Sequence, residues 1–187
     1  MKAHLITLIS LFFSLSVHAK NISGVDIPES ISLSDNSKPL ILNGAGIRSK
    51  FIFDIYIGSL YLEEKQTNTN AVYNAEGQKS IRMHFLYDEV SQEKLISGWN
   101  DGFENNNSEQ ELAKLKSRID QFNSFFIRVK KGDTIYLNFF PSIGTEIVIN
   151  NSRKGIIKGN DFFTAVLKIW LGDDPADEDL KAAMLGQ

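Results

Sequence analysis

Few residues in this sequence could carry chemistry, and one arginine stands out among them. Arg48 ends the segment LNGAGIR. A Ser-Lys pair follows it, and then residues 51–62, FIFDIYIGSLYL, which are rich in aromatic and aliphatic side chains. A guanidinium keeps its proton at physiological pH, so burying it requires an anion or several hydrogen-bond acceptors. Arg48 is therefore expected to meet an anionic ligand or a carboxylate of the protein itself. Asp54 is the internal candidate, although in one extended strand it would lie about 20 Å further along.

The histidine and cysteine counts exclude several common kinds of site. The chain has no cysteine and three histidines, of which His4 and His18 lie in an N-terminal apolar segment. A zinc site of the usual nitrogen and sulfur type cannot be built from His84 alone, and a cysteine nucleophile is absent. His84 lies within a predicted strand, where a structural role is expected. The acidic run 173–179 lacks the spacing of a calcium loop and is expected to cap a helix. We therefore predict no catalytic residue set, no metal site and no cofactor.

The first nineteen residues have the pattern of a secretory signal peptide. Lys2 precedes an apolar run at residues 5–17, and Val-His-Ala at 17–19 resembles a cleavage site. The apolar run is shorter than the ~20 residues that a membrane-spanning helix needs. The sequence predicts a signal peptide at 1–19, one domain at 20–187, and export to a bacterial periplasm with only transient membrane association, if any.

Charge and composition narrow the class of partner. The formal net charge is −3, and the basic residues form no cluster. Nucleic acid is therefore not a predicted partner, because binding phosphates requires grouped Lys and Arg side chains. Without cysteine, the stability of an exported domain must come from packing rather than from disulfides.

Hydrophobic periodicity predicts one α+β domain. The expected strands are one or two within residues 21–38, then 40–42, 51–62, 79–87, 134–140, 145–149 and 154–157. Residues 63–70 are expected to form a loop. Four helices are expected, one capped by Ser91, one opened by a capping box at Ser108, one capped by Asn160 or Asp161, and one opened by Asp174-Pro175. Trp99 and Trp170 lie on apolar helix stripes and are assigned to the core.

Gly44 and Gly46 resemble the start of a dinucleotide-binding fingerprint, but the third glycine is missing and a strand follows where a helix should. These glycines are expected to permit a sharp turn or close backbone packing instead.

Several segments together resemble the chalcone isomerase superfamily, in particular its bacterial exported chalcone isomerase-like branch. The segments are GAGIR at 44–48, YIGSLYL at 56–62, WNDGF at 99–103, KGD at 131–133, GIIKG at 155–159 with DFF at 161–163, and IWLGD at 169–173 with Pro175. They occur in the right order over nearly all of residues 20–187. The resemblance implies an open-faced β-sandwich, in which an antiparallel sheet carries a helical layer and a ligand cleft lies between them.

The resemblance also implies roles for individual positions. Arg48 matches the arginine with which the plant enzymes hold an anionic oxygen of the substrate. Tyr56 matches a position that is threonine in the plant enzymes and tyrosine in fatty-acid-binding members, where it grips a carboxylate together with the arginine. Val90 stands where the plant enzymes place a tyrosine that helps to organise the reactive ketone.

We therefore expect a non-catalytic binding protein whose ligand-binding residues are Arg48 and Tyr56. The expected partner is a small amphipathic anion such as a fatty acid. Two alternatives stay open at this stage. One is an intramolecular lyase or isomerase that acts on a chalcone or another enone, and the other is a periplasmic interaction module.

Overall fold

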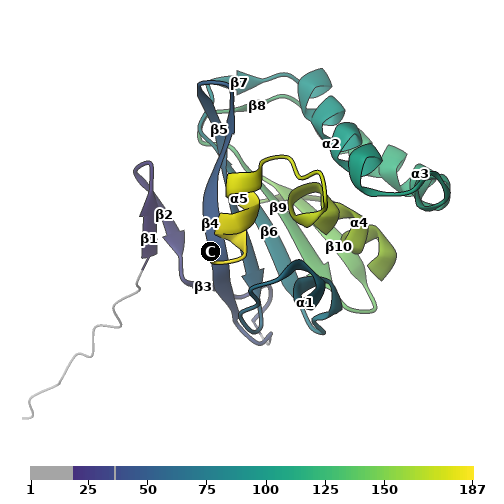
Figure 1. Ribbon diagram of the computed structural model, residues 1–187, viewed down its shortest axis with the longest axis horizontal. Helices are drawn as coiled ribbons and strands as arrows, with labels where there is room; N and C mark the ends of the chain where they lie inside the picture. Colours follow the sequence, from purple (N-terminus) through teal and green to yellow (C-terminus); the bar gives the residue numbers. More distant parts are fainter. Residues whose placement is uncertain (1–18, 36) are drawn as a thin grey trace, which may run out of the picture.

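Seven antiparallel strands form the central sheet, and the computed structural model describes residues 19–35 and 37–187 of the chain (Figure 1). The strand order across the sheet is β11-β10-β9-β6-β5-β4-β3. These strands are β3 (Ser30–Ile31), β4 (Leu40–Lys50), β5 (Phe53–Leu62), β6 (Lys79–Phe85), β9 (Thr134–Phe140), β10 (Gly144–Ile149) and β11 (Ser152–Ile157). Two small pairs stand apart from the sheet, β1 (Ala19–Ile22) with β2 (Val25–Pro28) and β7 (Glu89–Val90) with β8 (Val129–Lys130).

One face of the sheet carries the helices (Figure 1). They are α1 (Thr69–Asn74), α2 (Gln92–Asn106), α3 (Glu109–Ser124), α4 (Asn160–Leu171) and α5 (Glu178–Met184). The main apolar core lies between this layer and the inward side chains of the sheet, such as Leu60, Ile81 and Leu137, which are fully buried. Helix α4 is apolar on almost every side because it lies between the sheet and helices α2 and α3.

A second, smaller apolar cluster lies on the opposite face of the sheet. Ile57 and Tyr61 alternate with the core-facing residues of β5, and Ile27 of β2 packs with them. The Tyr61 hydroxyl donates a hydrogen bond of 2.9 Å to the Pro28 carbonyl. The β1–β2 hairpin therefore covers only part of this face, which gives the open-faced arrangement.

The predicted α+β class, the meander of β9, β10 and β11, and two helix starts are confirmed. The Ser91 side chain caps α2, and Ser108 with Glu111 forms the capping box of α3. Both signals are local, since each hydrogen bond joins residues three positions apart.

Three predictions about helix boundaries are wrong. Helix α1 falls partly within the expected 63–70 loop, where Asn68 caps it through the Ala71 amide. Helix α4 begins at Asn160, so Gly159 occupies the cap position and has no side chain with which to cap the helix, and Asp161 pairs with Arg118. Helix α5 starts three residues later than expected, as described next.

Asp177 rather than Asp174 caps α5, because its carboxylate satisfies two separate amides. One oxygen accepts from the Leu180 amide at 2.9 Å and the other from the Ser49 amide at 3.1 Å. Asp174 accepts instead from the side chain of Asn105 in α2. The N-terminus of α5 is thereby attached to the strand that carries Arg48. The expectation that the acidic run caps a helix is confirmed at Asp177.

The glycines before Arg48 lie inside β4 and allow α5 to approach the strand closely. A Cβ at Gly44 would lie 2.0 Å from the Ala183 carbonyl oxygen, and one at Gly46 would lie 2.6 Å from the Ala183 Cβ. The alternative of close backbone packing is therefore confirmed, and the sharp turn is wrong.

The predicted signal peptide at 1–19 lies almost entirely outside the described residues, so it stays a prediction. Within residues 19–35 and 37–187, no helix is both long and apolar enough to cross a membrane.

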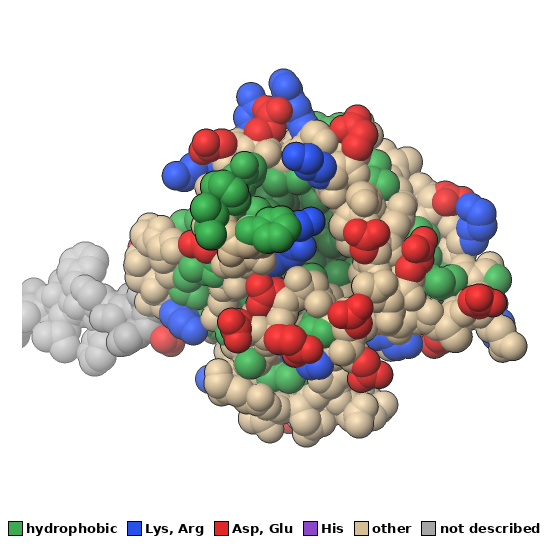
Figure 2. Space-filling model, turned by 45° about the horizontal axis from the view of Figure 1, so that its top comes forward, with side chains coloured by type: hydrophobic (Ala, Val, Ile, Leu, Met, Phe, Trp, Pro, Cys, Tyr) green, Lys and Arg blue, Asp and Glu red, His purple; other side chains and the backbone are tan. Residues whose placement is uncertain are grey.

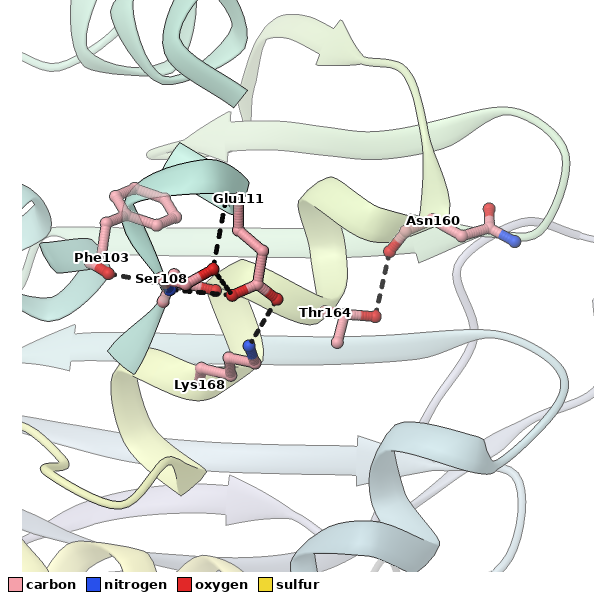
Figure 3. A network of polar contacts seen from close by, with 7 residues as sticks. Phe103, Ser108, Glu111, Asn160, Thr164 and Lys168 are labelled. Atoms are coloured by element: carbon pink, nitrogen blue, oxygen red, sulfur yellow. Dashed lines mark hydrogen bonds and ion pairs between the residues drawn. The ribbon is translucent and has the colours of Figure 1, made fainter. Parts of the chain in front are cut away.

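A polar network fixes the start of α3 to α4 (Figure 3). Glu111 accepts hydrogen bonds from the Ser108 amide at 2.8 Å and hydroxyl at 2.7 Å, and Lys168 donates to its other oxygen at 3.2 Å. The hydrogen bonds from Ser108, and then the Lys168 ammonium, lower the pKa of Glu111 from 4.5 to about 2.

Glu111→Gln is expected to lower the free energy of unfolding at neutral pH by about 0.3–1 kcal/mol, because solvent reaches the pair with Lys168 and screens it in part. A lowered folded-state pKa adds stability that is present above pH 4.5 and lost as the pH falls towards about 2. The difference between wild type and variant should therefore shrink across this range in urea unfolding. Glu109→Gln, on the same helical turn, is the control. A difference that stays constant from pH 7 to pH 2 would contradict the assignment.

Candidate functional site

A two-residue turn brings Arg48 and Tyr56 together. Lys50 pairs with Phe53 across the turn, and Arg48 pairs directly with Tyr56 in the β4–β5 ladder. The Arg48 guanidinium carbon lies 5.8 Å from the centroid of the Tyr56 ring. The predicted single strand over 51–62 is wrong at its start, because Phe51 and Ile52 form the turn and the strand begins at Phe53.

Tyr56 is held as a buried, neutral hydrogen-bonding group. Its side chain is buried against Phe85, and its hydroxyl oxygen accepts a hydrogen bond of 2.9 Å from the Trp170 indole N–H. Burial raises the pKa of the Tyr56 phenol above its ordinary value, although the Arg48 charge acts in the opposite direction. The phenol therefore keeps its proton, and this O–H has no protein acceptor among the described residues. Tyr56 can thus donate to a bound ligand.

Arg48 is half-buried and is not neutralised by the carboxylates beside it. In the part of the chain that the structure describes, no Asp or Glu lies within ion-pair distance of its guanidinium. The turn folds Asp54 back to the level of Ser49, whose hydroxyl donates to it at 2.9 Å. Asp177, the next nearby acid, caps α5. The side chain of Arg48 is thus available to an external anion.

A cleft of about 780 Å³ lies beside this pair, between the sheet, helix α2 and the segment that joins α4 to α5. Its size is within the range of small-molecule sites in proteins. Figure 2 shows the molecule with this end turned forward, where hydrophobic side chains border a hollow that also contains Lys or Arg side chains. The apolar part of the wall includes Phe51, Phe53, Ile55, Met83, Phe85, Val90, Leu95, Trp99 and Ile169.

Charged side chains of both signs also line the cleft. The cationic side chains are Arg48, Lys50 and Lys94, and the acidic ones are Glu89, Glu93, Asp101 and Asp174. Arg48 differs from the two lysines because it is half-buried and lies beside Tyr56. No group of three or more His, Asp or Glu side chains among the described residues is arranged to hold a metal ion.

The family of the chain follows from comparison with known proteins. The sequence model of the family described as chalcone isomerase-like matches residues 19–186. The chain belongs to this family. The crystal structure of a fatty-acid binding protein from Arabidopsis thaliana is similar to it, with a TM-score of 0.69 and 17% sequence identity over 90% of this chain and 95% of that chain. At this identity the likeness shows the shared fold. No curated protein sequence matches the chain.

The chalcone isomerase-like fold brings the two predicted residues together, and it adds partners that the sequence did not indicate. Trp170 was assigned to the core, which is correct, but its hydrogen bond to Tyr56 joins positions 114 residues apart. No local spacing could have indicated that contact. Val90, which stands where the plant enzymes are expected to have a tyrosine, lines the cleft with an aliphatic side chain.

Tyr56→Phe is expected to lower the free energy of unfolding by about 1–3 kcal/mol, because the buried Trp170 N–H loses its acceptor. Urea unfolding followed by tryptophan fluorescence measures the change. Tyr136→Phe on the opposite face of the sheet is the control, with an expected change within about 0.5 kcal/mol. Equal stability of Tyr56→Phe and wild type would show that the Trp170 contact contributes nothing.

Proposed function

We propose that this chalcone isomerase-like protein binds a fatty acid, or a similar amphipathic anion, in the cleft beside Arg48 and does not transform it. The observation that carries the proposal is a half-buried arginine that forms no ion pair with any Asp or Glu of residues 19–35 and 37–187, next to a cleft with a largely apolar wall. A carboxylate head and a hydrocarbon tail complement these two features together. The related fold of a protein named as a fatty-acid binding protein supports the same class of ligand.

The head of the ligand would receive two hydrogen bonds from the ladder pair. Arg48 would supply a charge-assisted hydrogen bond, and Tyr56 would donate through the O–H that its contact with Trp170 leaves free. The raised pKa of Tyr56 favours this role, because a phenolate could not donate. The tail would lie against residues such as Met83 and Phe85, where each buried methylene contributes about 0.8 kcal/mol.

The non-catalytic part of the proposal rests on the composition of the cleft. Closing a chalcone ring needs a positioned substrate and stabilisation of an enolate. Arg48 could supply charge, but Val90 supplies no hydrogen-bond donor where the family resemblance implies one. Export to a periplasm, as the sequence predicts for residues 1–19, would place the protein where lipids released from membranes are accessible.

Arg48→Met is expected to weaken binding of a long-chain fatty acid by about tenfold to a hundredfold, because a hydrogen bond to a charged group is worth about 1.5–3 kcal/mol. Isothermal titration calorimetry on delipidated protein measures the affinity. Lys50→Met is the matched control, since this exposed cation lines the rim of the same cleft and should matter little.

The matching fatty alcohol provides a second control, because it keeps the tail and lacks the carboxylate. It should bind wild type and Arg48→Met with similar affinity. Equal affinity of wild type and Arg48→Met for the fatty acid would reject the assigned role. If wild type converts a chalcone and Arg48→Met does not, the protein is an enzyme, and the proposal of binding without catalysis is rejected.

A further inference from the structure

The turn between β4 and β5 has side chains that its geometry does not favour. Phe51 and Ile52 are the two loop residues of this hairpin, and Phe51 has a φ of +57°. Two-residue hairpin loops favour Asn and Gly, because a positive φ is costly for a residue with a bulky side chain. The chain thus places an aromatic residue where a small one would suit the fold better.

The same two residues gain nothing from packing. Phe51 is 92% exposed and Ile52 is 88% exposed, the highest values among the exposed large hydrophobic side chains of the described residues. Their exposure and the strain at Phe51 both oppose stability. Such local conflicts with the rules of folding are typical of functional positions.

The turn also forms part of the cleft mouth. Lys50, Phe51 and Phe53 line the cleft, so a ligand that enters beside them passes the exposed tip. Strands β7 and β8 lie at the same end of the molecule, where Lys130 and Lys131 are exposed (Figure 1). Glu89 of β7 lies 3.8 Å from Lys130 and partly offsets this charge.

We propose that the Phe51–Ile52 tip docks on the surface of a lipid bilayer, so that the amphipathic ligand moves between the bilayer and the cleft; this rests on the proposed function. Two apolar side chains beside a lysine match an interfacial anchor, in which the apolar groups enter the acyl boundary and the ammonium meets headgroup phosphates. A stable protein partner would need about 800 Å² on each side, far more than one turn supplies. A fatty acid partitions into bilayers, so a cleft mouth that contacts a bilayer would let the ligand pass between the two without crossing water.

Vesicle flotation of the purified protein tests this proposal, with phosphatidylcholine vesicles that contain or lack phosphatidylglycerol. Ile52→Asn is the main variant, because Ile52 is exposed and does not line the cleft. It should reduce the bound fraction about tenfold or more, whereas fatty-acid affinity in vesicle-free buffer should not change. Ile143→Asn is the matched control, since Ile143 is 54% exposed in the β9–β10 turn at the opposite end of the sheet.

Phe51→Asn provides a second variant that suits the turn, so it should lose vesicle binding while its thermal midpoint stays the same or rises. Wild type that does not float with either vesicle, or Ile52→Asn that floats as wild type does, overturns the proposal. If sedimentation velocity shows a dimer of wild type that Ile52→Asn dissociates, the tip binds a second copy of the protein, and the membrane proposal is overturned. Failure of the proposed function is separate, because it would appear as weak fatty-acid binding without vesicles.

Discussion

The permanent positive charge of Arg48 determines what the cleft can bind. A guanidinium keeps its proton even when it is partly buried. Of the nearby acids, Asp54 accepts a hydrogen bond from the Ser49 hydroxyl, and Asp177 accepts from the Ser49 and Leu180 amides. The cleft therefore has a fixed positive group at one side of an apolar wall. The proposed ligand would provide the anionic partner that the described residues do not provide.

The rest of the fold holds this charge in place. Gly44 and Gly46 let α5 pack directly on β4, and Asp177 joins the start of that helix to the strand at Ser49. Trp170, from the apolar helix α4, fixes the Tyr56 hydroxyl opposite Arg48. Helices α5 and α4 thus support the Arg48–Tyr56 pair, and α2 forms a wall of the cleft beside it. A site held on strands in this way stays rigid while the turn beside it can remain exposed.

Sequence reasoning predicted what local patterns and family resemblance can specify. Alternation identified β6 and the β9–β11 meander, and capping spacing located the starts of α2 and α3. The hairpin between β4 and β5 was missed because Phe51 and Ile52 occupy positions where Asn or Gly normally signals a turn. Contacts such as Trp170 with Tyr56 depend on the tertiary fold, so no spacing along the chain could show them.

The ionisation of a bound ligand shows whether the Arg48 guanidinium contacts a carboxylate in the cleft. A fatty acid labelled with ¹³C at its carboxyl carbon can be titrated in the cleft by NMR, in wild type and in Arg48→Met. Contact with the guanidinium should lower the pKa of the bound carboxyl below that of the free acid, whereas burial in an apolar cleft alone should raise it. We expect a lowered carboxyl pKa in wild type and a raised one in Arg48→Met. The same carboxyl pKa in both proteins would contradict it.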